Sequence, residues 1–261
     1  MIKQICRFEA ANYSRPTFAE LVGETLFPLA EGAPFSSLDR IGDSIALTDA
    51  RLLPPILPSK IVCVGRNYAE HASELGNKVP TEPLLFLKPP SSLIANGETI
   101  VLPPQSNQVE YEGEIGIIIG RVAKGLTGDD NAFDYIFGFT CVNDVTARDL
   151  QRKDVQFTRG KSFDTFCPVG PSIALGVDPS TLGVETRVNG LMKQKGHSQQ
   201  MVFSIDFLVR YISNIMTLLP GDLIATGTPS GVSMLSAGDI VEIEVNGVGV
   251  LRNSVASACQ N

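Results

Sequence analysis

The spacing of apolar residues predicts a chain built mostly of β-strands. Short apolar runs bounded by Gly, Pro and Asn are typical of strands inside a sheet. Such runs occur at residues 60–65, 84–88, 114–119, 136–142 and 185–188. Near the C-terminus, residues 240–245 and 248–252 flank Asn246-Gly247, a pair that favours a type I′ turn. We therefore expect a hairpin there.

One segment has the periodicity of a helix. Between residues 203 and 219, apolar side chains recur at intervals of three and four, and Pro220-Gly221 ends the pattern. We expect this helix to pack on the sheets through one apolar stripe. The stripe consists of Ile205, Leu208, Val209, Ile212, Ile215 and Leu219.

The N-terminal part of the chain has a different character. Residues 1–55 show only weak periodicity, and the segment RLLPPILP at 51–58 is so rich in proline that we expect a connector. The sequence therefore predicts a small N-terminal domain at residues 1–55 and a larger domain at residues 56–261.

Composition and charge exclude several classes of function. The chain has 261 residues, a net charge of -7 and a pI near 4.9, which argues against nucleic acid or an anionic membrane surface as a partner. No apolar run reaches the ~18 residues of a membrane-spanning helix, and the first residues lack the apolar core of a signal peptide. Five scattered cysteines fit a reducing compartment. We expect a cytoplasmic protein, long enough to be an enzyme.

Three carboxylates in apolar surroundings are the strongest functional signal. Glu112 and Glu114 precede the apolar run 115–119, and the period of a strand places both on one face. Buried there, two ionised carboxylates cost several kcal/mol each unless a cation compensates them. Asp144 lies where a second apolar run gives way to a helical pattern. The three are candidate ligands of a hard divalent ion; a solvated strand face or two structural ion pairs are the alternatives.

The histidine content restricts the identity of this ion. His71 and His197 are the only histidines, so a site with three histidines is excluded, and an iron site with two histidines and one carboxylate would need both. Mg²⁺ or Mn²⁺ is therefore the expected ion.

Two further motifs carry candidate chemistry. His71 and Glu74 are three residues apart in a short helical pattern, so the carboxylate can orient the imidazole as a general base; a surface ion pair is the alternative. Lys161 follows Gly160 in an expected loop, where its ammonium can reach a developing oxyanion; an ordinary solvated lysine is the alternative.

Taken together, six motifs resemble those of the fumarylacetoacetate hydrolase family. They lie between residue 60 and the C-terminus in the order typical of that family, and residues 1–55 lie outside the resemblance. The motifs are VGRNYAEHASE at 64–74, LFLKP at 85–89, EGE at 112–114, NDVTARDLQ at 143–151, GKSF at 160–163 and TGTPSGV at 226–232.

The resemblance implies a mixed, β-rich α/β fold with a rolled sheet and few helices. It implies that Glu112, Glu114 and Asp144 hold one Mg²⁺ or Mn²⁺. Lys161 would stabilise an enolate, and His71, oriented by Glu74, would activate a water from a helix that acts as a lid. The residues implied to bind substrate are Arg66, Lys88, Gln151 and Thr228.

The resemblance also implies a substrate class and several reactions. The substrate is a small 2-oxo or 2,4-dioxo carboxylic acid, and we expect hydrolysis of the C–C bond of acylpyruvates such as acetylpyruvate or fumarylpyruvate. The same enolate chemistry supports oxaloacetate decarboxylation or tautomerisation and isomerisation of 2-hydroxyhepta-2,4-diene-1,7-dioate, which the sequence does not separate from hydrolysis. A metal-binding β module without activity is a third reading, disfavoured by the complete set of His71, Glu74 and Lys161. A homodimer is also implied.

Overall fold

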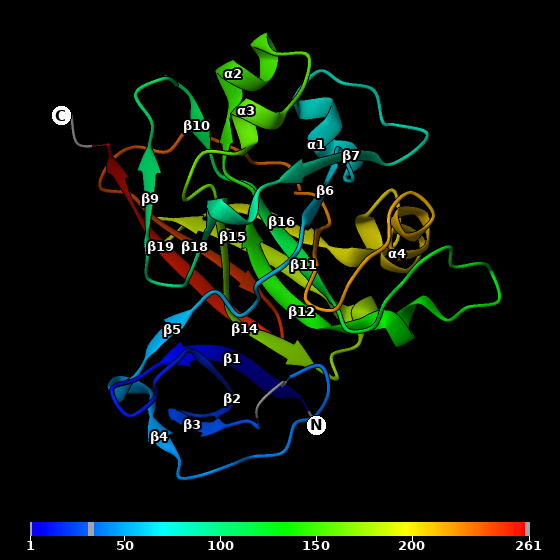
Figure 1. The fold of residues 1–261 in the computed structure, drawn as a ribbon. Coiled ribbons are helices and arrows are strands. Elements are labelled where there is room, and N and C mark those ends of the chain that lie inside the picture. The colour runs from blue at the N-terminus through cyan, green and yellow to red at the C-terminus, as the bar shows by residue number, and fades with distance from the viewer. Residues whose placement is uncertain (1, 31–33, 259–261) are drawn as a thin grey trace.

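Two β-sheets form the frame of the protein, and the computed structural model describes residues 2–30 and 34–258 of it (Figure 1). The larger sheet follows the order β4-β3-β2-β1-β14-β12-β11-β17-β6-β7, with β5 paired to β1 and β8 paired to β14. The smaller sheet follows the order β16-β15-β18-β19-β9, and β10 pairs with β13. The β-rich fold predicted from the sequence is confirmed.

The strands of the larger sheet are β1 (Lys3–Glu9), β2 (Thr17–Val22), β3 (Thr25–Pro28), β4 (Ile45–Ala46), β5 (Arg51–Leu53), β6 (Ile61–Gly65), β7 (Leu84–Lys88), β8 (Leu93–Ile94), β11 (Gly113–Ile119), β12 (Ile136–Asn143), β14 (Cys167–Leu175) and β17 (Leu223–Ala225). Those of the smaller sheet are β9 (Thr99–Leu102), β15 (Gly183–Val188), β16 (Leu191–His197), β18 (Ile240–Val245) and β19 (Gly249–Ser257). The short pair is β10 (Val109–Glu110) and β13 (Thr146–Ala147).

Helices are few and short. The α-helices are α1 (Ala69–Glu74), α2 (Arg148–Lys153), α3 (Thr158–Lys161) and α4 (Ile205–Ser213). Single 3₁₀ turns lie at Leu47–Asp49, Pro90–Ser92, Ala132–Tyr135, Pro179–Thr181 and Ser198–Gln200. No helix in the described part of the chain is long and apolar enough to cross a membrane.

The core lies on both faces of β11. Every residue of this strand is buried, and its side chains alternate between two clusters. Ile115, Ile117 and Ile119 join the cluster that includes Val184 of the smaller sheet, while Ile118 joins a second cluster. Burial on both faces explains why the strand is a continuous apolar run rather than an alternating one.

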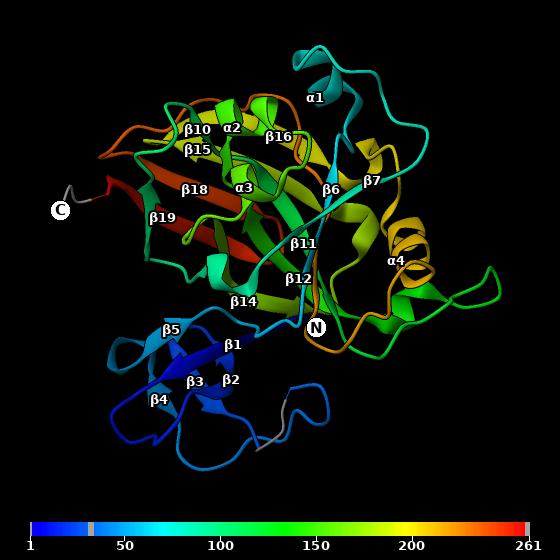
Figure 2. The same cartoon turned by 45° about the horizontal axis from the view of Figure 1, so that its top comes forward.

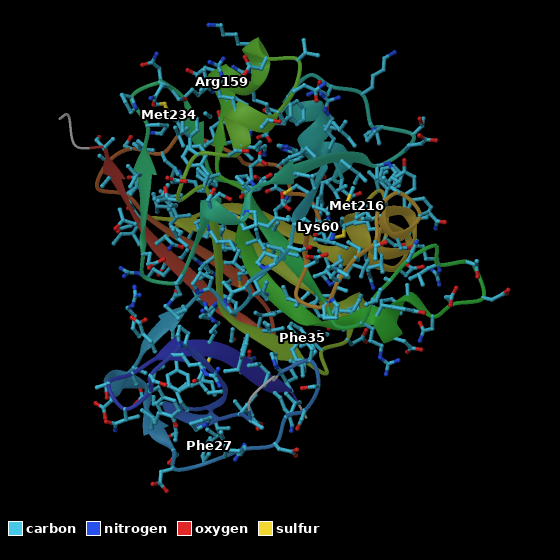
Figure 3. All side chains as sticks on the ribbon, in the orientation of Figure 1. Phe27, Phe35, Lys60, Arg159, Met216 and Met234 are labelled. Atoms are coloured by element: carbon cyan, nitrogen blue, oxygen red, sulfur yellow. The ribbon has the colours of Figure 1, made fainter. Side chains whose placement is uncertain are left out.

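The N-terminal strands form their own corner of the molecule, at the bottom of Figures 1 and 2. Cys6 and Phe8 belong to a small separate core cluster, but β1 also pairs with β14 and so continues the larger sheet. Phe35, labelled in Figure 3, contacts Phe137 of β12 edge-on at 4.9 Å. The domain boundary near residue 55 stays a prediction.

Two expectations about the bounds of local elements need correction. The segment 51–58 is not only a connector, because Arg51–Leu53 forms β5 on β1. The helix predicted to reach residue 219 ends at Ser213. Both the Ser213 hydroxyl and the Asn214 amide donate to the carbonyl of Arg210, and such local bonds compete with helix continuation.

The predicted C-terminal hairpin forms, but with a different turn. Val245 of β18 pairs with Gly249 of β19, and Gly247 rather than Asn246 adopts a positive φ, of 78°. The type I′ geometry is found instead at Asn189-Gly190, with φ angles of 52° and 77°, where Val188 pairs with Leu191. The four described cysteines are buried free thiols, and Cys259 lies outside the described residues.

Candidate active site

A cavity of about 440 Å³ is lined by residues of α1, α2, α3 and the ends of β6, β11 and β12. The three helices lie at the top of Figure 1. The structure brings most of the predicted site together there, from segments far apart in the sequence. Eight of the ten predicted residues line the cavity: Arg66, His71, Glu112, Glu114, Asp144, Gln151, Lys161 and Thr228. Glu74 and Lys88 lie behind it, in contact with residues that do.

Strand pairing brings the three carboxylates together. Glu112 directly precedes β11, Glu114 is the second residue of β11, and Asp144 directly follows β12. Because Gly113 pairs with Asn143, these positions meet at one end of the two strands. One oxygen from each carboxylate can be chosen so that all three lie within 4.8 Å of one another. The three side chains are buried, so the alternative of a solvated strand face is wrong.

Three cationic side chains surround these carboxylates. Lys161 Nζ lies 2.8 Å from Glu112 Oε2 and 2.6 Å from Asp144 Oδ2. Lys88 Nζ lies 2.7 Å from Asp144 Oδ1 and donates to the carbonyl of Val145 at 3.1 Å. Both oxygens of Asp144 therefore have cationic partners. The substrate contact expected of Lys88 stays a prediction, and its observed contacts orient Asp144.

Arg148 supplies the third cation. Its Nη2 donates to Glu112 Oε1, and its Nε lies 2.7 Å from Glu110 Oε2. Burial would raise the pKa of Glu112, but the charges of Lys161 and Arg148 outweigh this effect and hold the pKa below its ordinary value. Glu112 is therefore an ionised, firmly held acceptor.

Glu114 shows that the cluster has room for one more cation. It is 2 % exposed, and within residues 2–30 and 34–258 only the backbone N–H of Gly227 donates to it, at 2.8 Å on Oε2. Burial and the charges of Asp144 and Glu112 raise the pKa of Glu114 well above its ordinary value. Among the described residues, Glu110, Glu112 and Asp144 form ion pairs with Lys88, Arg148 and Lys161, and Glu114 forms none. The donor set therefore fits a hard divalent ion with oxygen ligands.

Lys161 has a different setting from the one expected. It is the last residue of α3 rather than part of a loop, and because it is 2 % exposed the alternative of an ordinary solvated lysine is wrong. Its Nζ also lies 4.9 Å from the ring centre of Phe86, a distance that suits a cation–π contact. A buried ammonium of this kind is a fixed positive charge at the floor of the cavity.

The His71–Glu74 pair forms on α1 as predicted. His71 Nδ1 lies 3.3 Å from Glu74 Oε2, and His71 is buried while the Glu74 side chain is 33 % exposed. A carboxylate on Nδ1 favours the tautomer with hydrogen on that nitrogen, which leaves the Nε2 lone pair free to accept a proton. The alternative of an exposed surface pair is wrong for the imidazole.

The remaining predicted residues occupy the cavity in different ways. Arg66 has a φ of 60°, and its side chain has no ion pair or hydrogen bond among the described residues. Gln151 Oε1 accepts from Arg148 Nη1 at 2.6 Å, which leaves its amide N–H groups available. Thr228 donates to the carbonyl of Gly113 at 2.9 Å and accepts from Gln194 at 2.8 Å. Arg66 is therefore the cation best placed to receive an anion.

Sequence reasoning missed Arg148 and several lining residues. Arg148 lies three residues before Gln151 on α2, so the helical spacing alone put it beside a predicted site residue. Phe86 and Phe157, whose rings meet edge-on at 5.5 Å, form an apolar part of the lining. No sequence signal brings these two together, because they come from β7 and from the residue before α3.

Comparison with known proteins agrees with this arrangement. Residues 60–256 match the family described as fumarylacetoacetate (FAA) hydrolase, C-terminal. The chain is 52% identical over 213 residues to an uncharacterized protein of Archaeoglobus fulgidus, an alignment that covers 82% of this chain and 85% of that protein. It is 41% identical over 233 residues to the oxaloacetate tautomerase YisK of Bacillus subtilis, covering 83% and 77%.

A solved structure is similar over the whole chain. The 2-hydroxyhepta-2,4-diene-1,7-dioate isomerase from Mycobacterium marinum superimposes with a TM-score of 0.90 at 41% identity. The superposition covers 99% of this chain and 100% of that chain. The likeness therefore includes the N-terminal strands, which lie outside the family match.

Proposed function

Since the chain belongs to the fumarylacetoacetate hydrolase family, we propose that it enolises a small 2-oxo acid, with keto–enol tautomerisation of an oxaloacetate-type dicarboxylate as its reaction. The observation that carries the proposal is the pairing of a buried acidic trio with a His71–Glu74 dyad around one cavity. The similarity to an oxaloacetate tautomerase supports this choice among the reactions that share an enol.

We assign the metal to the acidic trio. Glu112, Glu114 and Asp144 would hold one Mg²⁺ or Mn²⁺, in keeping with the divalent metal typical of the family. When bound, the ion polarises the ketone oxygen and so makes the neighbouring C–H more acidic. The lack of a cationic partner for Glu114 among the described residues supports this assignment.

The side chains of the cavity would bind the 2-oxo acid and stabilise developing charge. The free guanidinium of Arg66 suits the carboxylate remote from the ketone, and Gln151 and Thr228 offer neutral contacts to the carboxylate beside it. The Lys161 ammonium lies next to Glu112 and Asp144, where it can stabilise negative charge on the ketone oxygen.

His71 moves the proton. Its Nε2 would take a proton from C3, the carbon beside the ketone, while Glu74 holds the imidazole through Nδ1. The protonated Nε2 of His71 then gives a proton to the oxygen on C2, which regenerates the neutral imidazole, so tautomerisation consumes no water. Two aromatic rings, Phe86 and Phe157, line the cavity and reduce the access of solvent to the reacting carbons.

Acylpyruvate hydrolysis, the reaction expected from the sequence, is the second candidate. The observation that favours it is again the free Nε2 of His71, which can activate a water as well as accept a carbon-bound proton. The water would add to the distal carbonyl, and the C–C bond would break to release a carboxylic acid and the enol of pyruvate. The two candidates differ in whether water is consumed.

One set of assays separates these reactions. Purified protein is incubated with Mg²⁺, Mn²⁺ or EDTA and given enol-oxaloacetate, acetylpyruvate or fumarylpyruvate in turn. We expect metal-dependent loss of oxaloacetate enol absorbance without release of CO₂. Cleavage of acetylpyruvate at a higher kcat/KM would replace the first candidate by the second. Turnover of all three substrates that is unchanged by EDTA would refute the metal assignment.

We also infer that the protein is a homodimer, as the family resemblance implies. An interface of standard size would bury roughly 800 Å² on each partner. Light scattering at micromolar concentration tests this, because the chain mass is 28.0 kDa and a dimer has twice that mass. A mass of one chain at that concentration would contradict the inference.

A further inference from the structure

Glu74 is held at both of its carboxylate oxygens. Oε2 faces His71 Nδ1 at 3.3 Å, and Oε1 accepts from the backbone N–H of Gly231 at 3.0 Å. Glu74 is the last residue of α1, a helix of six residues, so the helix itself restrains the side chain weakly. The hydrogen bond from the Gly231 N–H therefore sets the orientation of the Glu74 carboxylate toward His71.

Gly231 is itself fixed from two sides. Its φ is +103°, and a Cβ at this position would lie 2.1 Å from the carbonyl oxygen of Lys193, so only glycine fits here. Its carbonyl accepts from the hydroxyl of Tyr111 at 2.8 Å. The backbone of Gly231 thus connects Tyr111 to Glu74.

Tyr111 belongs to the segment that carries the acidic trio. It is 1 % exposed and lies directly before Glu112 in the chain. The chain of contacts runs from Tyr111 Oη to the carbonyl of Gly231, from the Gly231 N–H to Glu74 Oε1, and from Glu74 Oε2 to His71. It joins the strand segment of the metal ligands to the helix of the proposed base.

We propose that Tyr111 is a positioning residue for His71. Its hydroxyl holds the backbone of Gly231, the Gly231 N–H holds Glu74, and Glu74 orients the imidazole toward the cavity. Tyr111 touches neither substrate nor metal in this assignment. The proposal rests on the proposed function, because it gives His71 the task of moving a proton.

The first test is Tyr111→Phe, which removes one hydroxyl and keeps the ring. We expect kcat for oxaloacetate enol conversion to fall about fivefold, the effect of one net hydrogen bond, with KM within about twofold of the parent. Tyr68→Phe is the matched control, since Tyr68 is also buried but its hydroxyl has no hydrogen-bond partner among the described residues. We expect the control to keep the kinetics of the parent.

A double-mutant cycle distinguishes positioning from general damage. If Tyr111 acts through Glu74, the fivefold effect should shrink to less than about twofold in a Glu74→Ala background. An equal effect of Tyr111→Phe with and without Glu74 would overturn the proposal. Unchanged kcat in Tyr111→Phe would overturn it as well.

A spectroscopic test does not depend on the reaction. The chain has only two histidines, so ¹⁵N spectra of the imidazoles can be assigned with His71→Gln. We expect the parent to show His71 as one tautomer with hydrogen on Nδ1, and Tyr111→Phe to show a mixture of tautomers. An unchanged His71 spectrum would contradict the positioning role. If the spectrum changes while no 2-oxo acid is turned over, the proposed function is wrong and the positioning role stands.

Discussion

The two walls of the cavity differ in how firmly they hold their charged groups. The carboxylate wall consists of Glu112, Glu114 and Asp144 with Lys88, Arg148 and Lys161, all nearly inaccessible to solvent. Five ion pairs within the wall and to Glu110 fix these side chains. The helix wall consists of Arg66, His71 and Glu74. One ion pair and one backbone contact hold His71 and Glu74, and no described residue pairs with the Arg66 side chain.

This difference indicates a division of labour within one site. The ends of β11 and β12 are fixed by their pairing within the larger sheet, so the carboxylate wall is organised before a ligand arrives and suits the binding of a metal ion. A helix of six residues can shift at low cost, so the helix wall suits a base that must approach and leave the substrate. Ion pairs therefore fix the carboxylate wall everywhere except at Glu114, while the helix wall keeps His71 and Arg66 available for a substrate.

The largest effect is expected from replacing Glu114, the carboxylate of this wall that has no ion pair among the described residues. Glu114→Gln keeps the shape of the side chain but removes the ligand charge, so metal binding measured by calorimetry should be lost. Turnover should fall by at least on the order of a thousandfold, since a metal supplies several kcal/mol of transition-state stabilisation. Glu24→Gln, at an exposed position, is the control. Tight Mg²⁺ or Mn²⁺ binding by Glu114→Gln would refute the ligand assignment.

The same variant should stabilise the protein in the absence of metal. Burial, Asp144 and Glu112 raise the pKa of Glu114 well above its ordinary value, so the folded protein binds a proton that the unfolded chain has released. Stability conferred by this group is present at low pH and is lost as pH rises. In EDTA, the Tm of Glu114→Gln should exceed that of the parent at pH 8, with a smaller difference at pH 5. A lower Tm at both pH values would contradict this reading.

The next largest effect is expected from replacing His71, the proposed general base of the helix wall. His71→Ala should lower tautomerisation, and any acylpyruvate hydrolysis, by on the order of a hundredfold or more, while calorimetry shows metal binding close to that of the parent. Decarboxylation of oxaloacetate needs no base to remove a proton or activate water, so we expect that activity to fall less. Equal losses in all three reactions would assign His71 to substrate positioning instead.

Sequence reasoning succeeded where the chemistry is encoded locally. Glu112 and Glu114 are two apart before an apolar run, and His71 and Glu74 are three apart in a helical pattern, so spacing alone pairs them. The sequence also predicts Asp144 as a third ligand, because it lies at the end of a strand and adjacent strands bring their ends together. The wider assignment of Arg66, Gln151 and Thr228 came from the order of the family motifs rather than from physical spacing.

Other features depend on contacts that no local pattern reports. The sequence predicts a loop for Lys161 and leaves a solvated lysine as the alternative, but tertiary packing buries it against Glu112 and Asp144. The contact of Glu74 with Gly231 joins positions 157 residues apart. The end of α4 depends on polar side chains at its C-terminus, and these outweigh an apolar period that continues to Leu219.

The smallest effect on turnover is expected from replacing Arg66 of the helix wall, and Arg148 of the carboxylate wall provides the comparison. Arg66→Ala removes a guanidinium that has no partner in the described part of the chain, so the free energy of unfolding should change by less than about 1 kcal/mol. If Arg66 receives the remote carboxylate of the substrate, KM for oxaloacetate should rise at least tenfold or so, with kcat within about threefold. Arg148→Ala instead leaves Glu110 and Glu112 without their shared cation, and we expect a loss of about 3–5 kcal/mol of stability. Chemical denaturation and steady-state kinetics measure both variants. Two results would contradict this interpretation: an Arg66→Ala variant that is less stable than Arg148→Ala, or one whose KM is unchanged. Either result would mean that Arg66 is not a free cation that binds a substrate anion, and the two walls would then not differ at this position.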